Sequence, residues 1–147
     1  MNKKFDRGLY DKYNNHGIQV GASFLRQLGY NPINFDEAYK SHDFITEKDG
    51  QTYKIECEVT EKWTHIQFPY PYMSIPYRKK DSNADFYIRT NPSGTALYCM
   101  RMADVFKAPV IRKNTLYTCN EPFFNVDTKT LTLYYLEDGV WYEEYET

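Results

Sequence analysis

The chain has 147 residues, of which 26% are charged and 41% are hydrophobic, as expected for one globular domain with a modest core. Its net charge is −2, which excludes a strongly basic protein that binds nucleic acid through overall charge alone. The charge is uneven, because residues 120–147 hold seven of the 20 acidic residues and one of the 18 basic ones.

The cysteines and the first residues bear on the compartment. Cys57, Cys99 and Cys119 show no CxxC spacing, which is typical of reduced thiols in a cytoplasmic protein. The polar start of the chain does not resemble a secretory signal, and no run approaches the length of a membrane span. We therefore expect a cytoplasmic protein without a membrane contact.

Helical spacing predicts the first element, a helix over residues 9–28. Gly17 and Gly21 lower its helix propensity, but they would let the helix pack closely on a sheet. A short turn is expected over residues 35–40. The apolar residues that recur on one face of the helix are Ile18, Ala22, Leu25 and Leu28.

The dipeptide Asp49-Gly50 predicts a two-residue hairpin loop, because it lies between strand-like runs at 42–46 and 52–60. Lys48 then pairs with Gln51, and counting outward brings Asp43 opposite Glu56. Glu58 lies on the same face of the second strand, whereas Cys57 faces the core.

The three acids need a compensating charge, because like charges that face each other destabilise a sheet. A divalent cation is the simplest solution, since Mg²⁺ takes carboxylate oxygens together with water and phosphate oxygens. The sequence therefore predicts a Mg²⁺ site, in which Mn²⁺ can substitute, with Asp43, Glu56 and Glu58 as ligands.

The segment 68–77 contains three prolines and is expected to be an ordered irregular connection. A basic cluster of Arg78, Lys79 and Lys80 follows it directly. Further on, turn residues separate four expected elements. These are strands at 84–90 and 95–101, a short helix at 102–107, and a second hairpin that joins 131–136 to 140–145 through Asp138-Gly139.

The order of a helix, an Asp-bearing strand, a hairpin and a Glu-x-Glu strand resembles the PD-(D/E)XK nuclease superfamily. The resemblance spans about residues 9–107. It implies an α/β fold of the restriction-endonuclease-like type, a mixed central sheet flanked by helices, in a single nuclease-like domain over residues 1–147 that ends in a C-terminal β-hairpin. The residues that carry it are His42-Asp43-Phe44-Ile45, Tyr53-Lys54-Ile55-Glu56-Cys57-Glu58-Val59, Ile75-Pro76-Tyr77-Arg78-Lys79-Lys80 and Ala84-Asp85-Phe86-Tyr87-Ile88.

The resemblance also implies roles for the acids. Asp43 stands at the aspartate of the motif and Glu56 at its second acid, while Glu58 stands where lysine is usual, as glutamate does in some restriction enzymes. A second register, with Glu58-Val59-Thr60 as the motif, would leave Glu56 a supporting role.

The source of the positive charge stays open at this point. Lys54 and Lys62 share the face of the acidic strand, and the cluster of Arg78, Lys79 and Lys80 could be brought in by its loop.

The function implied is a metal-dependent endonuclease that hydrolyses phosphodiester bonds in DNA. Glu58 is either a metal ligand or the base that orients the attacking water. The candidate catalytic residues are Asp43, Glu56, Glu58, Lys54 and Lys62, and the candidate nucleic-acid contacts are Arg78, Lys79 and Lys80, for which a solvated loop cluster is an equal alternative.

Two other functions stay open. Because the usual lysine is absent, the domain could be an inactive nucleic-acid-binding module, and its aromatic residues could instead make it a small protein-interaction domain. Cutting both strands of a duplex would call for a homodimer, with the aromatic C-terminal hairpin as its candidate interface.

Overall fold

The structure is a computed structural model that describes residues 7–33, 43–116 and 119–144, so the turn expected at 35–40 lies outside it. Its helices are α1 (Arg7–Gln27) and α2 (Met102–Val105), with 3₁₀ helices η1 (Tyr77–Asp81) and η2 (Thr128–Thr130). Its strands are β1 (Asn31–Ile33), β2 (Phe44–Lys48), β3 (Gln51–Val59), β4 (Tyr72–Pro76), β5 (Phe86–Thr90), β6 (Ala96–Arg101), β7 (Val110–Lys113), β8 (Glu121–Asp127), β9 (Leu133–Glu137) and β10 (Val140–Glu143).

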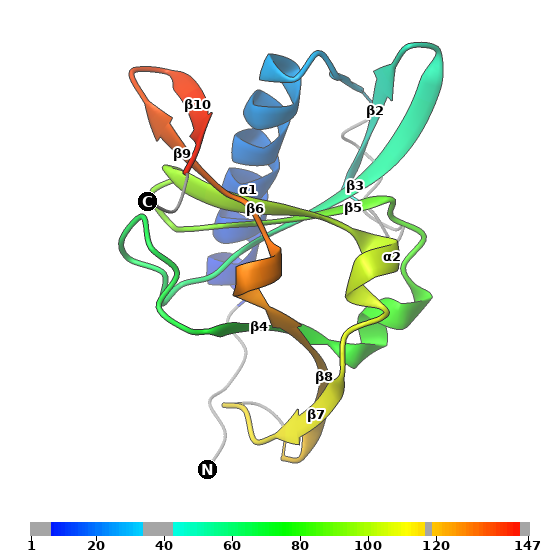
Figure 1. Ribbon diagram of the computed structural model, residues 1–147, viewed down its shortest axis with the longest axis vertical. Helices are drawn as coiled ribbons and strands as arrows, with labels where there is room; N and C mark the ends of the chain where they lie inside the picture. Colours follow the sequence, from blue (N-terminus) through cyan, green and yellow to red (C-terminus); the bar gives the residue numbers. More distant parts are fainter. Residues whose placement is uncertain (1–6, 34–42, 117–118, 145–147) are drawn as a thin grey trace.

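The strands form two sheets. Seven of them lie in the order β1-β2-β3-β5-β6-β9-β10, in which β3 and β5 run parallel and the other neighbours antiparallel. The second sheet has the order β4-β8-β7. Helix α1 and the small sheet lie on opposite sides of the large sheet (Figure 1).

Each face of the large sheet therefore has its own core. Between α1 and the sheet lie Ala22, Phe24, Leu25, Phe44, Ile55, Cys57, Ile88, Leu97 and Trp141. Between the two sheets lie Trp63, Met73, Ile75, Ala84, Tyr87, Ala96, Tyr98, Met100, Met102, Val105, Phe124, Val126 and Leu133.

The expected α/β fold, a mixed central sheet flanked by helices in the restriction-endonuclease-like manner, is wrong. The described residues form ten strands and only two α-helices, of which α2 has four residues. The face opposite α1 is covered mainly by the sheet of β4, β8 and β7, with the short helix α2 beside it (Figure 1). The protein is therefore mainly β, with one long helix on one face.

The segment 68–77 is not wholly irregular, because it contains strand β4. Proline lacks an N–H group and is therefore confined to edges and ends of sheets. Strand β4 meets this condition, since among the described strands it pairs with β8 alone and Pro76 is its last residue. The strand was not predicted because its prolines favour a loop and its partner lies about 50 residues further along the chain.

Both predicted hairpins are confirmed. Lys48 pairs with Gln51 and Phe44 with Ile55, as the register predicted. Asp49 and Gly50 have φ angles of 52° and 78°, which match a type I′ turn with positive φ at both central residues. Strands β9 and β10 meet in the same way, with φ angles of 53° at Asp138 and 77° at Gly139.

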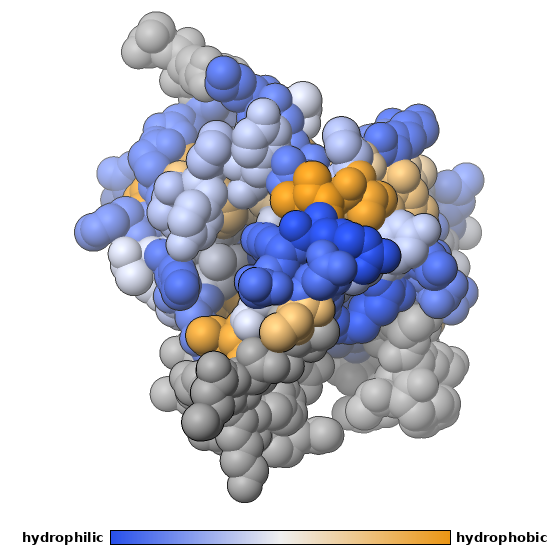
Figure 2. Space-filling model, turned by 90° about the horizontal axis from the view of Figure 1, so that it is seen from below, coloured by the Kyte–Doolittle hydropathy of each residue, from blue (hydrophilic) through white to orange (hydrophobic). Residues whose placement is uncertain are grey.

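The small sheet presents an apolar edge. Strand β7 is exposed along its whole length, with Val110 48% and Ile111 37% exposed beside Arg112 and Lys113. Figure 2, which looks at this end of the molecule from below, shows hydrophobic surface bordered by strongly hydrophilic surface.

None of the described helices is long and apolar enough to cross a membrane.

Gly21 fixes the distance between α1 and β3. A Cβ atom at Gly21 would lie 2.5 Å from the Sγ atom of the buried Cys57. We expect Gly21→Ala to destabilise the protein by about 1 kcal/mol net, because overpacking costs about 1–3 kcal/mol and the helix propensity of alanine offsets about 1 kcal/mol. Urea unfolding measures the difference.

Gly17→Ala is the matched control for that variant. Its added Cβ atom would lie 3.2 Å from Val59 Cγ2, a contact that a small shift relieves. This variant is therefore expected to be as stable as the wild type or slightly more stable. If the two substitutions change the free energy of unfolding equally, the close contact between Gly21 and Cys57 does not limit how near α1 lies to β3.

Candidate functional site

Asp43 lies just before β2 and beside the acidic strand β3. Its backbone N–H donates to the carbonyl of Ile55 at 2.8 Å, and its Oδ2 atom accepts from the backbone N–H of Cys57 at 2.7 Å. The paired residues of β2 and β3 end at Phe44 and Ile55, so the expected pairing of Asp43 with Glu56 is not seen among the described residues, but the Asp43 carboxylate bonds to β3 at Cys57, the residue after Glu56.

Lys79 joins the acids from η1. Its Nζ atom forms an ion pair with Glu56 Oε1 and lies 3.0 Å from Glu58 Oε1. Ser82 Oγ donates to the other oxygen of Glu56 at 3.1 Å. The Lys79 side chain is 19% exposed and that of Glu56 only 9% exposed, so this ammonium group is held between two carboxylates in a half-buried site.

Glu58 is fixed from the other side by strand β5. The parallel register pairs Glu58 with Arg89. The hydroxyl of Tyr87 donates to Glu58 Oε2 at 2.7 Å and accepts from Arg89 at 2.6 Å, while the Arg89 guanidinium lies 3.5 Å from the same carboxylate oxygen. Arg89 also donates to Thr60 Oγ1 and to the Ser74 carbonyl, so one buried cation ties β3, β5 and β4 together.

Tyr87 and Arg89 are members of the site that the sequence-based prediction missed. The available signal was Arg89 itself, because an arginine inside an otherwise apolar strand is rarely buried without a charged partner. Glu58 could be identified as the partner of Arg89 only from the parallel pairing of β3 and β5, which no local sequence pattern indicates.

The surroundings give the acids different proton affinities. Burial tends to raise the pKa of Glu58, but Arg89 and Lys79 outweigh it and hold that pKa at about 2. The pKa of Asp43 is raised to about 6, mainly by burial. The negative charges of Glu56 and Glu58 also raise this pKa, whereas the hydrogen bond from the Cys57 N–H and the positive charge of Lys79 lower it. Glu58 therefore stays ionised at ordinary pH, whereas Asp43 titrates near neutrality.

The other predicted basic residues do not contact these three acids. Arg78 is exposed and pairs with Glu121 at 3.2 Å, and the Lys80 Nζ atom lies 4.7 Å from the centre of the Tyr77 ring. Lys54 is half-buried and precedes Glu56 by two residues on β3, and Lys62 is exposed in the turn after β3. Among the five basic residues considered, Lys79 is the one that the structure brings to the site.

The carboxylate oxygens suit Mg²⁺ chemically, since this ion prefers oxygen ligands. Among the described residues, however, no group of three His, Cys, Asp or Glu side chains is arranged to hold a metal ion. Glu56 and Glu58 both form ion pairs with the ammonium group of Lys79, and the Oδ2 atom of Asp43 accepts a hydrogen bond from the Cys57 N–H. The Mg²⁺ site with Asp43, Glu56 and Glu58 as ligands stays a prediction.

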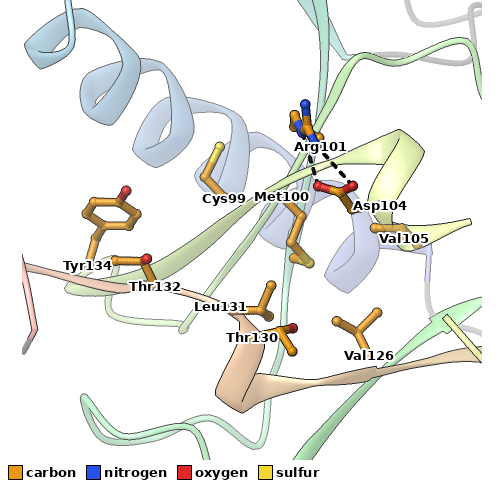
Figure 3. Close-up of a pocket in the computed structure, with 10 residues that line it drawn as sticks. All are labelled: Cys99, Met100, Arg101, Asp104, Val105, Val126, Thr130, Leu131, Thr132 and Tyr134. Atoms are coloured by element: carbon orange, nitrogen blue, oxygen red, sulfur yellow. Dashed lines mark hydrogen bonds and ion pairs between the residues drawn. The ribbon is translucent and has the colours of Figure 1, made fainter. Parts of the chain in front are cut away.

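A separate pocket lies beside β6, α2 and η2. Its volume is about 320 Å³, and Figure 3 shows Arg101 and Asp104 joined by hydrogen bonds among the residues that line it. It is distinct from the acid–lysine cluster, our name for Asp43, Glu56, Glu58 and Lys79, because none of these four residues lines it. The lining residues are Cys99, Met100, Arg101, Asp104, Val105, Val126, Thr130, Leu131, Thr132 and Tyr134.

The fold and the site together define a small two-sheet β protein with an acid–lysine cluster at the edge of its inter-sheet core. Comparison with protein-family models, with curated proteins and with solved structures finds no match for this chain. Support for a function therefore comes from the geometry and chemistry of the site itself.

Proposed function

We propose that the chain is a metal-dependent endonuclease that hydrolyses phosphodiester bonds in DNA, with a site of the PD-(D/E)XK kind. The observation that carries the proposal is the ammonium of Lys79 seated on Glu56 and Glu58, next to Asp43. Carboxylates and a lysine at one place are the groups that this hydrolysis needs, and here they come from separate segments of the chain.

Each group has a distinct role in the proposed reaction. Asp43, with its pKa raised to about 6, would ionise near neutral pH and could then bind the metal ion through a carboxylate oxygen. Glu58, with its pKa near 2, is a weak base and is better suited to bind a cation. Lys79 supplies positive charge to the phosphate, the role left open by glutamate at the usual lysine position.

The metal ion belongs to this proposal. Asp43, Glu56 and Glu58 would hold Mg²⁺ or Mn²⁺, which would polarise the phosphate and neutralise the leaving oxygen. Arg78 and Lys80 flank Lys79 on η1 and are exposed, so we assign them contacts with the DNA backbone outside the reacting phosphate.

The alternative of an inactive binding module is weaker than it was from the sequence. It rested on the missing motif lysine, and Lys79 puts a lysine ammonium on the same acids from another segment. A cytoplasmic location stays a prediction that rests on the thiols, since all three cysteines are free.

A homodimer remains part of the proposal for cutting both strands of a duplex. The hairpin of β9 and β10 is its proposed interface, because Val140 is 41% and Tyr142 is 45% exposed there. The rings of Tyr135 and Tyr142 stack on this hairpin with their centroids 5.7 Å apart, which helps to hold the two side chains in place.

Incubation with plasmid, linear duplex and single-stranded DNA tests the proposed function. Cleavage is expected with Mg²⁺ or Mn²⁺ and not with EDTA. Glu56→Gln should lower the rate by about 10²-fold or more, because the variant loses a charged ligand from the site. Glu121→Gln is the matched control, since Glu121 also pairs with a basic residue of η1, and this variant should cleave like the wild type.

Two results would decide against the nuclease, and a third would decide against the proposed site. DNA binding without cleavage would leave the inactive binding module. Neither binding nor cleavage, under any metal tried, would leave the protein-interaction domain. Cleavage that Glu56→Gln leaves unchanged would place the chemistry elsewhere in the chain.

A further inference from the structure

The acid–lysine cluster already contains a cation. The Nζ atom of Lys79 contacts one oxygen each of Glu56 and Glu58, which are alternate residues on one face of β3. These are two of the three carboxylates that a divalent ion would need. An ammonium group and a metal ion cannot occupy that place together, because both take the same oxygens and repel each other.

Lys79 is suited to leave this place. It lies on η1, a 3₁₀ helix of five residues, none of which is buried. The lysine side chain is long and flexible, so its ammonium can move while the backbone of η1 stays in position. Arg89 would remain as the fixed cation of Glu58, because it is held by Tyr87, Thr60 and Ser74 as well.

We propose that Lys79 and a divalent cation compete for Glu56 and Glu58, so that the metal loads only as the lysine is displaced. The role of the displaced ammonium rests on the proposed function: it moves to the phosphate of the substrate. A nearby phosphate gives Lys79 a new anionic partner, so DNA favours metal binding and metal favours DNA binding. The lysine thus keeps the site closed to metal when no substrate is present.

Calorimetric titration with Mn²⁺, in the absence of DNA, tests the competition. Lys79→Met removes the competitor and should bind Mn²⁺ about tenfold or more tightly than the wild type, because it removes the ammonium group from Glu56 and from the Oε1 atom of Glu58. Lys80→Met is the matched control, since this neighbouring lysine lies over Tyr77 rather than on the acids, and its affinity for Mn²⁺ should equal that of the wild type.

Thermal unfolding of the same variants gives a second readout. In EDTA, Lys79→Met should unfold at a lower temperature than the wild type, and Mn²⁺ should raise its unfolding temperature by more. Lys79→Gln, which is neutral but can donate hydrogen bonds to both carboxylates, is measured beside it in case Lys79→Met does not fold. Lys79→Arg keeps the charge and should bind Mn²⁺ as weakly as the wild type.

The outcomes separate this inference from the proposed function. Tighter Mn²⁺ binding by Lys79→Met or Lys79→Gln, with a wild type that cuts no DNA, would support the competition and count against the nuclease. Unchanged or weaker Mn²⁺ binding by both neutral variants, with a wild type that cuts DNA, would overturn the competition alone. Absence of Mn²⁺ binding by all variants would overturn it as well.

Discussion

Replacement of Arg89 by methionine is expected to destabilise the protein by about 3–5 kcal/mol, the cost of removing one partner from a buried ion pair. The Arg89 side chain is 10% exposed and lies 3.5 Å from Glu58. Without it, the Tyr87 hydroxyl and the Ser74 carbonyl also lose a donor. Urea unfolding at pH 7 measures the loss.

Arg101→Met provides the comparison for Arg89→Met. Arg101 also forms an ion pair, with Asp104 at 3.0 Å, but its side chain is 68% exposed. Exposed pairs of this kind contribute about 0–1 kcal/mol, so this substitution should change stability little. Similar losses for the two arginines would show that Arg89 is not the buried support of the site.

A second substitution separates the charge of Arg89 from its packing. In the double variant Arg89→Met with Glu58→Gln, the acid no longer carries the charge that lost its partner. The double variant should therefore recover part of the stability that Arg89→Met alone loses. If the two losses simply add, the arginine acts through packing rather than through Glu58.

Asp43→Asn is expected to lower the rate of DNA cleavage by about 10²–10³-fold while it stabilises the protein at alkaline pH. The folded protein raises the pKa of Asp43 from 3.8 to about 6 because the carboxyl is buried next to Glu56 and Glu58. The folded state thus favours the protonated acid. This contribution to stability is complete below pH 3.8 and is lost as the pH rises through about 6.

Asparagine is neutral at every pH and can still accept the hydrogen bond from the Cys57 N–H. Compared with the wild type, Asp43→Asn should therefore unfold at a higher temperature at pH 8, and this gain should disappear at pH 4. For the wild type, Mn²⁺ binding should strengthen as the pH rises through about 6, because the ion binds the ionised carboxylate of Asp43.

Asp85→Asn is the control for Asp43→Asn. Asp85 also accepts a backbone N–H, from Lys54 at 2.8 Å, but it is exposed. Its variant should cleave DNA like the wild type and show no gain at pH 8. A destabilised Asp43→Asn variant at pH 8, or one that cuts normally, would contradict the role given to Asp43.

The features predicted from the sequence are those that local residues determine. Asp49-Gly50 and Asp138-Gly139 adopt the positive φ angles of tight hairpins, and the first of these turns sets the register of β2 on β3, which ends at Phe44, next to Asp43. The alternation along β3 places Glu56 and Glu58 on one face without any knowledge of the rest of the chain.

The features that were missed depend on distant segments. Strand β4 pairs with β8 across about 50 residues, and its prolines resemble those of a loop. Arg89 reaches Glu58 only because β3 and β5 are parallel. Three consecutive basic residues begin at Arg78, and only the position of η1 on the sheets selects Lys79 from them.

A crystal structure of the protein soaked in Mn²⁺ tests the proposed site most directly. We predict one Mn²⁺ ion bound by oxygens of Asp43, Glu56 and Glu58, with the ammonium of Lys79 displaced from both glutamates. If Lys79 still bridges Glu56 and Glu58 at millimolar Mn²⁺ and no ion lies beside Asp43, the cluster is a structural ion pair and the proposed nuclease site is wrong.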